Sequence, residues 1–151
     1  MSNPPTCLAV DYGSTISTGT IDHLIGQKPV DPEAASALRA LHDDHRLRII
    51  LASNTQPHET RWPALQKAGI DNLFSVVLLS YPLGVRKPDP RFYELACATL
   101  GVEPEESVFL DDLGVNLKPA RALGMHTIKV TDPEEALAEL ARVLGHPVVD
   151  G

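Results

Sequence analysis

The chain has 151 residues, enough for one domain, 1–151, to bury a core without disulfides or a structural metal. Its 20 Asp and Glu residues outnumber its 13 Lys and Arg residues, and the net charge of -7 argues against a protein that holds nucleic acid through phosphates. No apolar stretch reaches the roughly 18 residues of a membrane span, and Cys7 and Cys97 have neither metal-ligand nor disulfide-framework spacing. We therefore expect a reduced, cytoplasmic protein that contacts neither nucleic acid nor membrane.

Strand and helix patterns alternate along the whole chain. In chain order they predict a strand over 6–11, a helix over 31–44, a strand over 47–53, a helix over 58–69, a strand over 74–80, a helix over 89–101, a strand over 107–111, a helix over 115–124, a strand over 126–130 and a helix over 132–145. Three helices begin with Asp-Pro, at Asp31, Asp89 and Asp132, where the aspartate caps the helix. Pro119 is expected in the first turn of its helix. We expect an α/β fold, a Rossmann-like three-layer α/β/α sandwich with a five-stranded parallel sheet.

The loops that follow the predicted strands carry reactive and charged residues. They are Asp11, Ser53, Asn54, Thr55, Lys87, Asp111 and Asp112. The carboxyl ends of parallel strands share one edge of the sheet, where such folds bind ligands. Each of these residues alone is also typical of a turn or a helix cap. Together the carboxylates would repel one another unless a cation and an anionic ligand completed the cluster.

This ordered set of residues resembles the haloacid dehalogenase superfamily over nearly the whole chain. The first strand of that family ends in a nucleophilic aspartate, matched by Asp11, and the second ends in Ser or Thr, matched by Ser53 in "LASN". Lys87 in "VRKPDP" matches the lysine that precedes a helix. The stretch "FLDDLGVNLKPARALGM" matches the acidic pair and the helix after it, and it is the most specific signal. Among subgroups, the sequence is most similar to the amino-terminal phosphatase domain of soluble epoxide hydrolases.

The resemblance implies a Mg²⁺-dependent hydrolase of phosphorylated substrates that works through an aspartyl-phosphate. The implied catalytic residues are Asp11, Ser53 and Lys87, the phosphate-binding residues are Ser53, Asn54 and Lys87, the metal ligands are Asp11, Gly13 and Asp112, and the supporting residues are Asp111 and Asn116. The chemistry needs these types, because a carboxylate attacks a phosphoryl group only where cations offset the charge of the phosphate oxygens. Gly13 would contribute its backbone carbonyl.

Gly13 is where the sequence departs from the family pattern. Family phosphatases usually carry an aspartate there, two residues after the nucleophile, as acid and then base. Such help contributes typically about 10² to 10⁴ in rate, so we expect slow turnover. Ser14 and Thr15 are poor acids that suit the local turn, and the alternatives on the following excursion are Asp22 and His23. Tyr12, by contrast, is expected to pack in the core.

The segments where relatives insert a cap domain are short. Only 15 residues separate Thr15 from Asp31, and 80–87 is shorter still. We expect a hairpin flap at most and a site open to water. An open site suits a large or extended substrate, or a second copy of the chain or another protein that covers it.

Two functions from different classes remain. The first is a phosphatase; dehalogenation and carbon-phosphorus hydrolysis are disfavoured because the pocket or lysine they need normally comes from a cap. The second is a binding or regulatory subunit that retains Mg²⁺ but has lost turnover. Gly13 supports the second, whereas the intact set of Asp11, Ser53, Lys87 and Asp112 opposes it.

Overall fold

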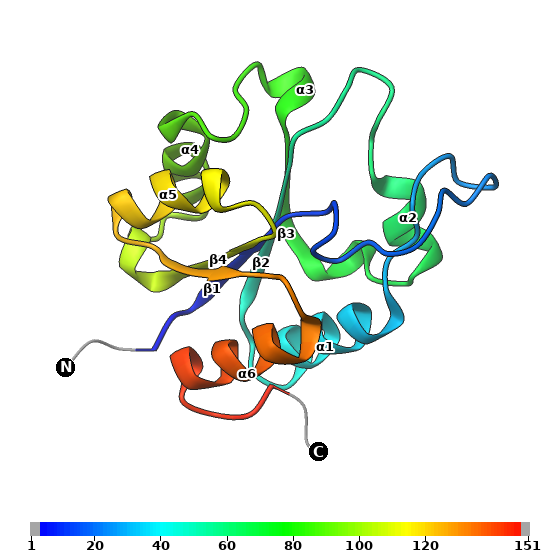
Figure 1. The fold of residues 1–151 in the computed structure, drawn as a ribbon. Helices are drawn as coiled ribbons and strands as arrows, with labels where there is room; N and C mark the ends of the chain where they lie inside the picture. Colours follow the sequence, from blue (N-terminus) through cyan, green and yellow to red (C-terminus); the bar gives the residue numbers. More distant parts are fainter. Residues whose placement is uncertain (1–3, 149–151) are drawn as a thin grey trace.

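Five parallel strands form one sheet in the order β3-β2-β1-β4-β5 in the computed structural model, which describes residues 4–148 (Figure 1). The strands are β1 (Cys7–Val10), β2 (Arg48–Ser53), β3 (Phe74–Leu79), β4 (Ser107–Asp111) and β5 (His126–Lys129). Each lies within its predicted range. The first strand is central and crossovers return on both sides of it, so the predicted fold class is confirmed.

Helices cover both faces of the sheet. They are α1 (Pro32–Asp43), α2 (Trp62–Lys67), α3 (Ser80–Leu83), α4 (Pro90–Leu100), α5 (Gly114–Leu123) and α6 (Pro133–Leu144), with short 3₁₀ turns η1 (Asp71–Leu73) and η2 (Pro104–Glu106). Asp31 and Asp89 cap α1 and α4 as predicted, because each side chain accepts from a backbone N–H of the first turn. Asp132 occupies the same position before α6, but its side chain makes no capping hydrogen bond.

Two helices differ from the prediction. α2 is shorter than 58–69, because residues 54–61 form an irregular loop and Pro63 lies in its first turn. Pro119 is the sixth residue of α5, so its expected place in the first turn was wrong. It has no N–H to donate to the carbonyl four residues earlier, yet Leu117 and Ala120 bury the inner face of α5, and this packing outweighs the lost bond.

Two apolar layers fix the strand ends in space. Alternate side chains of a strand point to opposite faces. Leu8 and Val10 of β1 pack with α1, α2 and α6 on one face, while Cys7 and Ala9 pack with α4 and α5 on the other (Figure 1). Both cysteines are buried and free, as expected. The sheet is therefore held from both sides, and side chains at its edge are positioned by a rigid support.

The excursion between β1 and α1 is a hairpin-like flap, residues 17–30. Two isolated antiparallel bridges join its arms, Ser17 to Val30 and Asp22 to Gln27, which confirms the predicted hairpin. Within residues 4–148, neither the flap nor the segment between β3 and α4 forms a cap domain. Of the helices in this part of the chain, none has the length and apolar character that crossing a membrane requires.

Candidate active site

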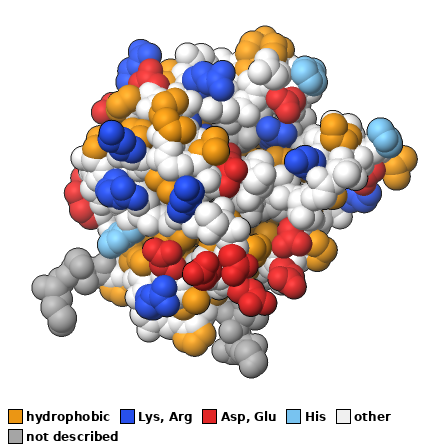
Figure 2. All heavy atoms as spheres, viewed as in Figure 1, with side chains coloured by type: hydrophobic (Ala, Val, Ile, Leu, Met, Phe, Trp, Pro, Cys, Tyr) orange, Lys and Arg blue, Asp and Glu red, His pale blue; other side chains and the backbone are white. Residues whose placement is uncertain are grey.

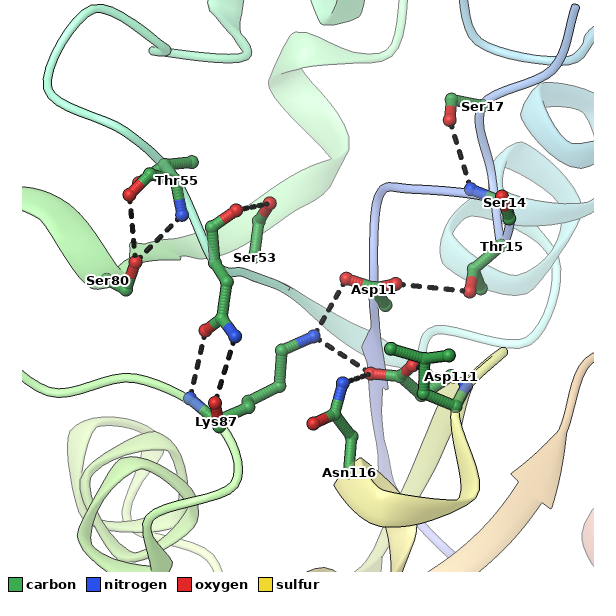
Figure 3. A network of polar contacts seen from close by, with 12 residues as sticks. Asp11, Ser14, Thr15, Ser17, Ser53, Thr55, Ser80, Lys87, Asp111 and Asn116 are labelled. Carbon is green, nitrogen blue, oxygen red and sulfur yellow. Dashed lines mark hydrogen bonds and ion pairs between the residues drawn. The ribbon is translucent and has the colours of Figure 1, made fainter.

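Three of the predicted site residues lie where strands end. Asp11 follows β1 directly, Ser53 is the last residue of β2, and Asp111 is the last residue of β4. The parallel register places Val10 level with Leu110, so Asp11 and Asp111 come side by side one residue further along (Figure 3). The sheet itself therefore brings together the aspartates at the ends of β1 and β4.

Lys87 lies between two of these carboxylates. Its Nζ donates to Asp11 Oδ1 at 2.7 Å and to Asp111 Oδ2 at 2.9 Å, and its side chain is only 1% exposed. The ring of Phe109 lies 5.6 Å from the ammonium nitrogen. A charge buried this deeply needs charged partners, and the two aspartates provide them.

The loops after β2 and β3 are joined by side-chain hydrogen bonds. The Asn54 side chain accepts from Lys87 N and donates to Lys87 O, both at 2.9 Å. Nearby, Thr55 N donates to Ser80 Oγ at 2.7 Å, and Thr55 Oγ1 accepts from Tyr81 N at 3.2 Å. The amide of Asn54 thus holds Lys87 with its oxygen and one of its two N–H groups, so its backbone N–H and the second side-chain N–H are left for the predicted contact with phosphate.

Three carboxylates gather around this one ammonium. Oxygen atoms of Asp11, Asp111 and Asp112 lie within 4.8 Å of one another. Burial raises the pKa of Asp11, although the positive charge of Lys87 acts in the opposite direction. Burial is also the largest cause that raises the pKa of Asp112, to about 6, and hydrogen bonding to Asp111 and repulsion from Asp11 and Asp111 add to it. Three carboxylates against one ammonium leave two negative charges, which a divalent cation would neutralise.

The hydrogen bonds distinguish the two neighbouring aspartates. Asp111 is completely buried; its Oδ2 accepts from Lys87 and from Asn116 Nδ2 at 3.2 Å, and its Oδ1 accepts from Leu113 N at 2.9 Å. Both of its oxygens therefore have protein donors. Asp112 is only partly buried and has the oxygen that remains for a metal. A set of carboxylate oxygens fits a hard cation such as Mg²⁺.

Sequence analysis missed Arg61 at this site. Its Nε donates to Ser53 Oγ at 3.2 Å, and its guanidinium stacks 4.5 Å from the centre of the Tyr12 ring. Arg61 has a φ of 68° at the start of α2, where the backbone turns its side chain back towards β2. The signal available in the sequence was a cation in the loop after the second strand. Tyr12 is buried, as predicted.

The side of Asp11 that faces Gly13 is open. A Cβ on Gly13 would meet nothing within 4 Å. Thr15 Oγ1 lies 3.5 Å from Asp11 Oδ2, so it is the only predicted substitute for the missing acid that contacts Asp11 within residues 4–148. Asp22 is paired with Lys67, which holds its pKa below the usual range, the opposite of what an acid catalyst needs, and His23 is exposed.

The chain is similar to two curated proteins over different shares of its length. The chain is 38% identical over 143 residues, 93% of its length, to "Acyl-CoA dehydrogenase family member 10" of Mus musculus. It is 51% identical over 72 residues, 48% of its length, to "Bifunctional epoxide hydrolase 2" of Sus scrofa, which confirms the predicted similarity to epoxide hydrolases. The matches cover 12% and 13% of those two proteins, so the chain spans about an eighth of the relatives' length.

A solved structure shares the fold. A haloacid dehalogenase family enzyme of Bacteroides thetaiotaomicron, solved in complex with magnesium and inorganic phosphate, superposes with a TM-score of 0.69 at 16% identity, covering 83% of this chain and 93% of that one. The family profile of haloacid dehalogenase-like hydrolases matches residues 10–124, a span that includes Asp11, Ser53, Lys87 and Asp111. The chain therefore belongs to the haloacid dehalogenase-like hydrolase family.

Proposed function

We propose that the chain is a Mg²⁺-dependent phosphatase that forms an aspartyl-phosphate on Asp11. The observation that carries the proposal is the position of Lys87 between Asp11 and Asp111, at 2.7 Å and 2.9 Å, with Asp112 beside them. A carboxylate nucleophile, a buried cation and oxygen ligands thus meet at one sheet edge, which is what phosphoryl transfer requires. The magnesium and phosphate in the Bacteroides enzyme of the same fold support this proposal.

Asp11, Asp112 and the carbonyl of Gly13 would hold the Mg²⁺. When bound, the ion offsets the charge on the phosphate oxygens. Asp111 has a different task, because its oxygens accept from Lys87, Asn116 and the backbone. It accepts from the Lys87 ammonium and holds it against Asp11, while Asn116 fixes the rotamer of Asp111.

The reaction proceeds in two displacements at phosphorus. An Asp11 oxygen bonds to phosphorus as the ester P–O bond breaks, and the leaving oxygen takes a proton. Water then attacks phosphorus and loses a proton, the bond to Asp11 breaks, and inorganic phosphate leaves. Ser53, the backbone of Asn54 and Lys87 hold the phosphate throughout. Gly13 neither gives nor takes a proton, so solvent water must do so, and both displacements are slow.

A binding or regulatory subunit is the second candidate, and Gly13 is the observation that favours it. Such a subunit would keep the metal and phosphate ligands without turnover. The buried cluster favours the phosphatase instead. Burying Lys87 with two carboxylates is costly, and a chain released from catalysis has no need of that arrangement.

The test is hydrolysis of phenyl phosphate by the pure protein with Mg²⁺. We expect slow release of phosphate that stops when Mg²⁺ is chelated, and a phosphoryl group on Asp11 in acid-quenched protein. Asp11→Asn should abolish both signals, while Asp44→Asn, an exposed position at the end of α1, should preserve them. Turnover no faster than that of Asp11→Asn across a broad panel of phosphate esters would favour the binding subunit.

The sheet edge that carries the site is surrounded by exposed apolar side chains that a binding partner could cover. Large apolar side chains are exposed on the loops and helix starts that surround it: Ile21, Trp62, Tyr81, Leu113 and Val115. We expect a second copy of the chain or another protein to cover this edge, or an extended substrate to lie across it. Sedimentation of the pure protein with and without Mg²⁺ tests the first of these.

A further inference from the structure

We propose that the cavity beside Gly13 binds the leaving group of the substrate and selects one that carries a single negative charge, a carboxylate. This inference rests on the proposed phosphatase function and names its substrate class. The cavity has a volume of about 370 Å³ and is bounded by Gly13, the flap and residues 58–61. Asp11 does not itself line the cavity, but the two residues after it, Tyr12 and Gly13, do, and Arg61 on its wall donates to Ser53 Oγ at the end of β2. Its volume is in the range of sites for small molecules.

The charges on the cavity wall favour an anion. Lys28, Arg61 and His58 line it with one carboxylate, Glu59, whose Oε2 lies 3.3 Å from Arg61. With His58 counted as neutral, these groups leave one positive charge, which matches a carboxylate better than a doubly charged phosphate. The wall stands out in a protein of net charge -7. Figure 2 shows acidic side chains gathered in a band over α1 and α6, where an anion would be repelled.

Tyr12, the residue after the nucleophile, contacts the backbone of Lys28 and the guanidinium of Arg61. Its buried hydroxyl donates to the backbone carbonyl of Lys28, and its ring lies 4.5 Å from the guanidinium of Arg61. The Arg61 side chain is only 12% exposed. Its Nε donates to Ser53 Oγ, and its Nη2 donates one hydrogen to the backbone carbonyl of Asn54. With Glu59 as the third partner, two of its five N–H groups have none within residues 4–148, and these can reach a ligand.

Gln27 on the flap gives an independent sign of a ligand. Its side-chain Oε1 is buried and accepts no hydrogen bond from residues 4–148, although it lines the same cavity. Buried polar atoms in proteins nearly always have a partner, so a change in the Gln27 rotamer, a water or a bound molecule would have to supply one here. A leaving group with a hydroxyl or amine in addition to its carboxylate would supply the missing donor.

The experiment compares two esters that differ in charge. The probes are 4-carboxyphenyl phosphate and its uncharged amide, 4-carbamoylphenyl phosphate, assayed with Mg²⁺. The carboxamide withdraws electrons more strongly, so chemistry alone favours the amide. We expect kcat/KM to be about tenfold higher for the carboxylate, as for one charge-assisted contact. Lys28→Gln and Arg61→Gln should each lower that ratio several-fold.

Arg142→Gln is the control, because it removes the same charge from the exposed last turn of α6 and should leave the ratio unchanged. A kcat/KM ratio of carboxylate to amide of one or less, or a ratio that Lys28→Gln does not change, would overturn this inference. Hydrolysis of phenyl phosphate in the same preparation would show that the proposed phosphatase function still holds. If no ester is hydrolysed, the proposed phosphatase function is wrong. Calorimetric titration of the Asp11→Asn protein with the two esters then tests the carboxylate preference of the cavity by itself. The carboxylate ester should then bind about tenfold more tightly than the amide, and equal affinities would overturn the inference.

Discussion

The two sides of Asp11 are built differently. On the side of Lys87, Asp111 and Asn116, every group is buried and each carboxylate oxygen of Asp111 has a donor. On the other side, Gly13 and most of the flap are exposed, and the two arms of the flap are joined by isolated bridges and not by a continuous pair of strands. The parts that neutralise phosphate are therefore fixed by the packed layers, whereas the parts that meet the leaving group depend on a short loop.

We infer from this difference that binding the phosphate and assisting the leaving group are separate tasks in this fold. The first task needs charges held at the ends of strands, and the sheet fixes them. The second needs a proton donor and a shaped wall, and the chain has an open cavity there instead. Each side can therefore be altered with its own expected effect.

Gly13→Asp should have the largest effect. The backbone at Gly13 is outside the left-handed region and a Cβ would meet nothing within 4 Å, so the side chain should fit without strain. An acid placed there should raise kcat for phenyl phosphate by about 10² to 10⁴. Gly13→Asn has nearly the same size but cannot transfer a proton, and it should give no gain. Equal rates for both variants would mean that the buried side is not a working site.

Lys87→Met removes the cation from the buried side of Asp11. It leaves Asp11 and Asp111 buried without their cation, and we expect the free energy of unfolding to fall by about 3–5 kcal/mol in urea without Mg²⁺. Mg²⁺ should restore part of that loss. Lys118→Met, at an exposed position of α5, should change the free energy by less than about 0.5 kcal/mol. An equally small effect at Lys87 would contradict the buried ion-pair network.

The smallest effect concerns pH. The pKa of Asp112 is raised from 3.8 to about 6, so its contribution to stability is present below about pH 4 and is lost as pH rises through 6. Without Mg²⁺, thermal unfolding should therefore show stability falling across this window, less steeply in Asp112→Asn and unchanged in Asp44→Asn. Mg²⁺ competes with the proton, so the Tm it adds should be larger at pH 7 than at pH 5. The same slope in wild type and Asp112→Asn would contradict this.

Most of the fold could be predicted because its signals are local. Buried strands were visible as β-branched runs, and Asp31 and Asp89 marked helix starts through short-range capping. Pro119 was misplaced because a local rule about proline ignores what the rest of the helix buries. Asp132 lies at its predicted position without its hydrogen bond, which depends on the rotamer and not on the residue type.

The site was predictable as far as strand ends determine it. Asp11, Asp111 and Lys87 meet as expected, and Ser53 ends the neighbouring strand. Parallel register brings the strand ends to one edge, and the loop before α4 brings Lys87 to the two aspartates. Two contacts depend on loop conformation, which residue types do not reveal: the commitment of the Asn54 amide to Lys87, and the turn of Arg61 towards Ser53. The pairing of Asp22 with Lys67 likewise depends on where the flap lies.

The bonds that join the loops after β2 and β3 have a dynamic consequence. Asn54 grips the backbone of Lys87 through two hydrogen bonds, and Thr55 and Ser80 grip each other through two more. These loops must then open as one cooperative unit, because freeing either leaves buried polar groups of the other without partners. The loop that carries Lys87 and the loop that follows Ser53 are therefore coupled, and the backbone amides of Thr55 and Lys87 should exchange hydrogen with solvent in a single event.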